Sequence, residues 1–161
     1  MSKPAAPTPA IGCTPVETAK TMTGLALLQG IMDGTLPLPP ICQALDFRFV
    51  ELSPGIAVVA GTPDFRFYNT LGTVHGGYTA TLLDSCMSSA VQTHLKAGLS
   101  YATVEFKVNL VRPLAEGVGT VRAEGKVINM GRTIATAEGR LVDAAGKLYA
   151  HGTTTCLVFP L

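Results

Sequence analysis

The chain has 161 residues, a length that suits one domain of ordinary size. Hydrophobic residues make up 47% of it and charged residues only 14%, against roughly 25% charged residues in typical soluble domains. So low a charge content predicts that apolar surface is buried against another subunit. The formal charge of +1, without a basic stripe, argues against a nucleic-acid partner. No apolar run approaches the roughly 20 residues of a membrane span, which argues against a membrane partner.

The cysteines and the N-terminus predict neither a metal site nor export. None of the four cysteines forms a CxxC pair, and no histidine stands at ligand spacing from any of them: Cys13, Cys42, Cys86 and Cys156. We therefore expect no metal, and free thiols in a reducing cytoplasm. Residues 1–17 are proline-rich and lack the apolar core of a signal peptide. They predict a flexible leader, followed by a single domain at 18–161.

The first half of the chain predicts a helix and a hairpin. Apolar residues recur at helical spacing from 18 to about 33, and Gly34 follows as a stop. The segment LPLPP at 36–40 predicts a connection, because proline fits neither a helix interior nor a central strand. Residues 46–52 and 56–61 read as two strands joined by a Ser-Pro-Gly turn.

A long helix is predicted after the irregular loop at 62–74. It should run from His75 or Gly76 to about Lys96, with Gly98 in position for a left-handed cap. Its first five turns carry few charges on any side, which is typical of a helix surrounded by protein.

The apolar period then changes from 3.6 to 2, which predicts antiparallel strands with short turns at 103–111, 119–128, 133–143 and 147–159. We expect an α+β fold in which a curved antiparallel sheet of five or six strands wraps around one long central helix, with a further helix at the N-terminus.

The start of the long helix, His75-Gly76-Gly77, is a candidate oxyanion site. The first amides of a helix have no internal partner, and the helix dipole adds partial positive charge there. Glycine lets a ligand approach that backbone, so the site suits a carbonyl oxygen that gains negative charge. The alternative is a tight joint between loop and helix with no chemical role.

Asp84 is the one carboxylate in the apolar part of this helix. An ionised group there costs free energy unless it is paired, solvated or used. It lies nine residues after His75, or about 13 Å along a helix axis, so it cannot reach a carbonyl held at Gly76 of its own chain. Two antiparallel helices across a two-fold axis would bring the groups together. The alternative for Asp84 is a polar residue facing a solvent-filled gap or capping a neighbouring turn.

The pattern Asn69-x5-His75-Gly76-Gly77-x6-Asp84 resembles the signature of the PaaI-like acyl-CoA thioesterases of the hotdog-fold superfamily. The flanks also resemble that family over about residues 20–160. The resemblance implies a six-stranded sheet around a long helix and a homodimer that shares one continuous sheet. It also implies a homotetramer built from dimers, and two sites per dimer, each made from both subunits.

The resemblance also implies roles for single residues. Gly76 resembles the residue whose amide polarises the thioester carbonyl, and His75 the residue that orders that loop. Asn69 resembles a polar group that places water or substrate, although it could equally be a turn residue that holds its loop. Asp84 resembles the carboxylate that acts as general base or nucleophile. Thr103 stands where relatives carry a Ser or Thr that holds the attacking water.

Positive side chains near the site would hold the phosphates of coenzyme A, which is part of the substrate and not a separate cofactor. Arg132 beside Gly131 is the first candidate, followed by Arg112 and Lys107, although each could be a solvated surface residue. The predicted activity is hydrolysis of an acyl-CoA thioester to a free acid and coenzyme A, without a metal.

Two rival functions stay open on the same fold. One is a non-catalytic acyl-CoA-binding module, and the other is an enoyl-CoA hydratase or dehydratase that would use His75. A serine hydrolase is unsupported, because no GxSxG surrounds the helix serines. The acyl group is not fixed by the sequence; Tyr68, Tyr78, Met87 and the loop at 62–74 are candidates for lining its pocket.

Overall fold

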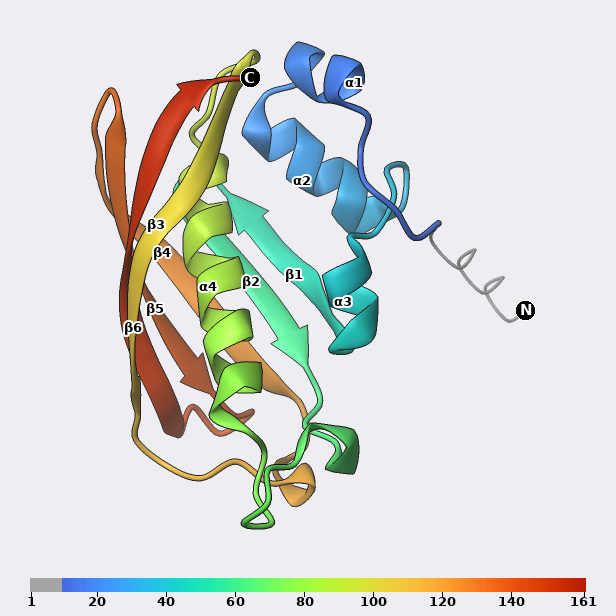
Figure 1. The fold of residues 1–161 in the computed structure, drawn as a ribbon, viewed down its shortest axis with the longest axis vertical. Helices are drawn as coiled ribbons and strands as arrows, with labels where there is room; N and C mark the ends of the chain where they lie inside the picture. Colours follow the sequence, from blue (N-terminus) through green and yellow to red (C-terminus); the bar gives the residue numbers. More distant parts are fainter. Residues whose placement is uncertain (1–9) are drawn as a thin grey trace.

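The computed structural model describes residues 10–161 and shows a curved sheet wrapped around one helix (Figure 1). Its strands are β1 (Phe47–Ser53), β2 (Ile56–Gly61), β3 (Leu99–Leu110), β4 (Val121–Met130), β5 (Ile134–Val142) and β6 (Leu148–Pro160). Its helices are α1 (Val16–Thr21), α2 (Gly24–Asp33), α3 (Pro40–Ala44) and α4 (Gly76–Gln92), with 3₁₀ turns at Phe65–Phe67 and Glu116–Val118. Within this part of the chain, no helix is both long enough and apolar enough to cross a membrane.

The six strands form one antiparallel sheet in the order β1-β2-β4-β5-β6-β3. Helix α4 lies across its concave face, where Leu82, Leu83 and Met87 have no exposed surface. Contact is so close that a Cβ at Gly125 would lie 2.2 Å from the carbonyl oxygen of Cys86. The α+β arrangement, with six strands around a central helix, is therefore confirmed.

The predicted helix at 18–33 is in fact two helices. The break comes at Thr23, whose hydroxyl accepts a hydrogen bond from the Ala26 amide and caps α2. Gly24 then passes so close to the end of α4 that a Cβ would lie 1.9 Å from the Gln92 carbonyl oxygen. This close approach depends on the tertiary fold, so the helical spacing did not reveal it.

The segment predicted as a leader carries regular structure in its described part. The backbone around Ile11 is bridged to Leu38, and α1 already begins at Val16. Residues 1–9 lie outside the described residues. The connection predicted at 36–40 ends one residue early, because Pro40 is the first residue of α3, a position that proline favours.

The boundary between α4 and β3 also differs from the prediction. Helix α4 ends at Gln92, not near Lys96, and the hydroxyl of its C-cap Thr93 donates to the Ala90 carbonyl and accepts from the Gly55 amide. Gly98 has the left-handed φ of 80°, but it serves the turn into β3. That strand begins at Leu99, four residues before the predicted start.

Strand β3 is a long edge strand with an exposed apolar side. A register shift between Thr103 and Glu105 marks a bulge at Val104 and interrupts the predicted alternation. Val104, Phe106 and Leu110 are 58%, 43% and 59% exposed. A long apolar edge of this kind is a template for pairing with another strand.

Candidate functional site

The start of α4 leaves one backbone amide free. His75 is the N-cap, and its Nδ1 accepts a hydrogen bond of 2.8 Å from the Gly77 amide. The Tyr78 amide donates to the His75 carbonyl at 3.0 Å. Over the described range 10–161, the N–H of Gly76 has no acceptor. The cap therefore leaves Gly76 as the donor that a ligand oxygen could use.

Asn69 holds the loop that leads into this helix. Its Oδ1 accepts from the amides of Leu71 at 2.8 Å and Thr73 at 3.3 Å, and its Nδ2 donates to the Thr73 hydroxyl at 3.0 Å. All these contacts lie within the loop, as a turn residue would make. The loop still brings Asn69 to the wall of a cavity of about 230 Å³ that Gly76 and Arg112 also line.

Asp84 and Thr103 meet in the seam between α4 and β3. The Thr103 hydroxyl donates a hydrogen bond of 3.0 Å to Asp84 Oδ1. Both residues are half-buried. Burial raises the pKa of the Asp84 carboxyl above its ordinary value, and the hydrogen bond from Thr103 lowers it in part. A carboxylate with a raised pKa is a stronger base than one in water.

Two residues of this seam were not singled out as site residues from the sequence. Tyr101 lies two positions before Thr103 on β3, and its phenol is 3.5 Å from the Ser88 hydroxyl, one helical turn after Asp84. Burial is the main cause that raises the pKa of Tyr101, so its hydroxyl stays protonated. The period of 2 along β3 places Tyr101 on the same face as Thr103 and could have identified it.

One chain does not bring Gly76 and Asp84 together. The two residues are eight positions apart on α4, about 12 Å along the helix axis. Because α4 is a continuous helix over this range, the structure keeps Gly76 and Asp84 as far apart as the sequence implied.

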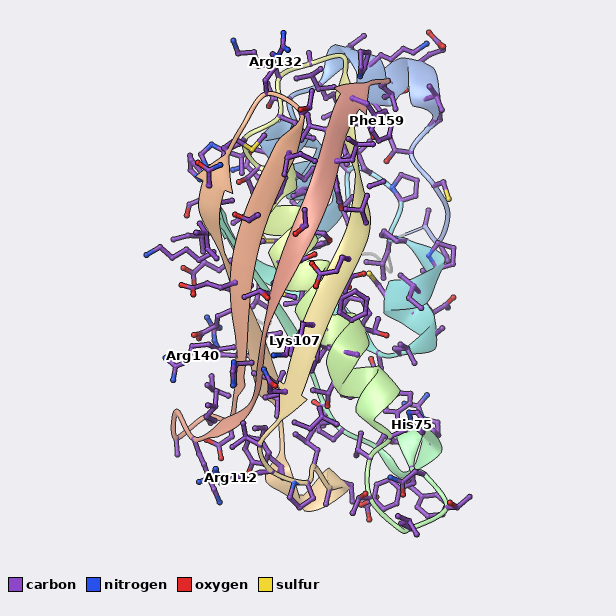
Figure 2. The ribbon with its side chains drawn as sticks, turned by 60° about the vertical axis from the view of Figure 1, so that its left-hand side comes forward. His75, Lys107, Arg112, Arg132, Arg140 and Phe159 are labelled. Carbon is purple, nitrogen blue, oxygen red and sulfur yellow. The ribbon has the colours of Figure 1, made fainter. Side chains whose placement is uncertain are left out.

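The two arginines expected to hold coenzyme A lie at opposite ends of the sheet. Figure 2 shows Arg112 near the His75 end of α4 and Arg132 at the far end of the sheet, with Lys107 between them. The Arg112 guanidinium donates to the Leu148 carbonyl at 3.2 Å. Arg132 is exposed in the β4–β5 hairpin, where a Cβ at Gly131 would lie 2.6 Å from the Ile134 carbonyl oxygen. Within one chain these arginines do not form a single site.

Two of the residues considered for the acyl pocket belong to the core. Tyr78 is 3% exposed and stacks on Phe67, with ring centroids 4.7 Å apart. Met87 is fully buried beneath β5, beside Gly139. The hydroxyl of Tyr68 accepts a hydrogen bond from the Glu116 amide. Tyr78 and Met87 therefore pack in the core that α4 forms with its neighbours.

Comparison with known proteins identifies the family. The model of the thioesterase superfamily matches residues 71–150. Acyl-coenzyme A thioesterase 13 from Mus musculus is 34% identical over 130 residues, which cover 80% of this chain and 91% of that protein. The chain belongs to the thioesterase superfamily.

Solved structures agree with this assignment. A phenylacetic acid degradation-related protein from Ralstonia eutropha JMP134 superposes with a TM-score of 0.73 at 25% identity, covering 81% of this chain and 98% of that one. The PaaI protein of E. coli, from the phenylacetic acid degradation operon, gives a TM-score of 0.66 at 21% identity, covering 74% and 83%. This thioesterase is thus PaaI-like with a hotdog fold, as its central motif predicted, and it is a thioester hydrolase.

Proposed function

We propose that this thioesterase hydrolyses acyl-CoA thioesters to a free acid and coenzyme A. The observation that carries the proposal is the Asp84–Thr103 pair, a half-buried carboxylate held by a hydroxyl beside an exposed apolar strand edge. A thioester carbonyl is already electrophilic, so one activated water or carboxylate and one oxyanion donor suffice.

The reaction divides between two groups. Asp84 takes a proton from water, whose oxygen attacks the carbonyl carbon, while the Gly76 amide donates to the carbonyl oxygen as it gains charge. Collapse of the tetrahedral intermediate breaks the C–S bond and releases the coenzyme A thiolate, which accepts a proton. The Thr103 hydroxyl holds Asp84, and its oxygen lone pairs can position the water.

Each site needs two subunits, because Gly76 and Asp84 are too far apart on one helix. Antiparallel pairing of two β3 edges would cover Phe106 and Leu110 and set two α4 helices side by side. Asp84 of one subunit would then face Gly76 of the other, and Arg112 of one subunit would lie at the same end as Arg132 of the other. Both arginines could bind the coenzyme A phosphates. The homotetramer and the cytoplasmic location stay predictions.

Asp84 can act as a base or as a nucleophile, and labelled water separates the two. In a single turnover in ¹⁸O water, base catalysis puts ¹⁸O directly into the acid product. Nucleophilic attack by Asp84 forms an acyl-aspartyl anhydride instead. Hydrolysis of that anhydride at the aspartyl carbon leaves ¹⁸O in the protein and an unlabelled first product.

The activity is tested by thiol release from a panel of aryl, short-chain and medium-chain acyl-CoAs. We expect release from at least one of them, and its loss in Asp84→Asn. Asp33→Asn, an exposed carboxylate on α2, is the matched control and should stay active. Tight binding of acyl-CoA with no thiol release would overturn the proposal in favour of a binding module. Hydration of an enoyl-CoA without thiol release would favour the hydratase.

A further inference from the structure

The seam between α4 and β3 continues past the Asp84–Thr103 pair and ends at a tyrosine. One helical turn beyond Asp84 lies Ser88, which is 6% exposed. Its hydroxyl is 3.5 Å from the phenol of Tyr101, so the tyrosine side chain reaches across the seam from β3 to α4. Tyr101 therefore closes the seam on the side toward the end of α4.

A second cavity lies behind Tyr101. It has a volume of about 100 Å³ and is bounded by α1, α2, the end of α4 and the start of β3. Its walls include the apolar side chains of Met22, Leu27 and Leu95, the polar residues Gln92 and Ser100, and Tyr101. Tyr101 thus borders both this cavity and the seam that holds Asp84.

The two directions along the seam suit different halves of a thioester. Coenzyme A carries charged phosphates, which need solvent and cationic partners. The end closed by Tyr101 is covered by helices and lined by apolar side chains, so it suits an acyl group. A water-sized group fills about 30 Å³, so the cavity behind Tyr101 has room for about three methylenes.

We propose that Tyr101 forms the end wall of the acyl slot and restricts this thioesterase to compact acyl groups, short-chain or aryl. The inference rests on the proposed acyl-CoA hydrolysis at Asp84. Truncating Tyr101 joins the slot to the cavity behind it, so longer acyl chains gain apolar contacts. Each buried methylene increases the affinity for the acyl chain by a factor of about four.

The test measures kcat and KM for saturated acyl-CoAs of increasing chain length. For Tyr101→Ala we expect the preferred chain to lengthen by two to four carbons. The ratio of kcat/KM for long over short chains should rise at least tenfold, mainly through KM, as expected of about three added methylenes. Tyr101→Phe is the matched control: it keeps the ring and loses only the contact with Ser88, so the wild-type profile should persist.

Thermal unfolding of each variant shows whether it is folded. Should Tyr101→Ala not fold, Tyr101→Leu opens less of the wall and should shift the profile in the same direction. An unchanged profile in a folded truncation variant would overturn the inference and leave the hydrolysis intact. A wild-type protein that prefers long chains would also overturn it. Absence of thiol release from every acyl-CoA would instead overturn the proposed function.

Discussion

The two sides of α4 meet the sheet in different ways. Toward β4 and β5 the helix is packed against backbone: a Cβ at Gly139 would lie 2.7 Å from Met87 Cγ, and one at Gly125 would meet the backbone of Cys86. Toward the β3 edge the side chains are small or polar, and Thr81, Asp84 and Ser85 are half-buried. The side toward β4 and β5 therefore stabilises the fold, while the side toward β3 contains a half-buried carboxylate that destabilises it. Substitutions on the two sides should separate stability from activity.

The largest effect is expected for Asp84→Asn. Loss of a general base lowers kcat by about 10²–10⁴-fold. The free energy of unfolding should stay the same or increase. Burial raises the pKa of Asp84 in the folded protein, so the ionised carboxylate destabilises the fold at pH values above this raised pKa. That cost disappears as the pH falls and the carboxyl is protonated, and Asn removes it at every pH. Thermal unfolding at neutral pH should give a Tm equal to or above that of the wild type; a clearly lower Tm would make Asp84 a structural residue.

Gly76→Pro removes the proposed oxyanion donor with little strain. Proline is favoured at the first helical position, and His75 has φ −60° and ψ 135°, which suits a residue before proline. A Cβ at Gly76 meets only the flexible end of Leu110. We expect kcat to fall by about 10²–10³-fold. Gly76→Ala keeps the N–H and should be at least tenfold more active than the proline variant. Equal activity of the two would show that the amide has no catalytic role.

Gly125→Ala, unlike Gly76→Pro, should lower the stability of the fold more than it lowers kcat. The added methyl group meets the backbone of Cys86 and Met87, which cannot rotate away. Overpacking of this kind costs about 1–3 kcal/mol. Chemical denaturation should show the loss, while kcat of the folded fraction should stay close to that of the wild type. A normal stability would mean that α4 can move away from the sheet.

The smallest effect is a shift in pH dependence for Thr103→Val. The hydrogen bond from Thr103 lowers the pKa of Asp84, so its removal lets that pKa rise further. The acidic limb of the profile of kcat/KM against pH should therefore move to higher pH. Thr103→Ser keeps the hydroxyl and should hold the limb in place. A shift to lower pH would exclude this hydrogen bond as the cause.

The sequence predicted most of the sheet, whereas the need for two subunits stays a prediction. The alternation at 103–111 identified a strand and the apolar run after His75 identified the central helix, because each pattern follows the period of its own element. The rise of 1.5 Å per residue was sufficient to separate Gly76 from Asp84. These features depend on the local geometry of a strand or a helix, which can be inferred from a single sequence.

The features that the sequence did not reveal depend on contacts between distant segments. The break before Gly24 exists because the chain passes the end of α4 there. The bulge at Val104 changes which residues of β3 face the helix, and simple alternation carries no signal for it. Arg112 and Arg132 were both proposed to bind phosphate because of their charge, but the fold places them at opposite ends of the sheet.

Complementation between two inactive variants tests the shared site most directly. Asp84→Asn and Gly76→Pro subunits, co-expressed in equal amounts, should form heterodimers in which one of the two sites has both wild-type groups. Since about half of the dimers would be mixed, we predict recovery of about a quarter of the wild-type thiol-release activity. Activity no greater than that of the separate variants, in a sample shown to contain heterodimers, would contradict a site built from two subunits.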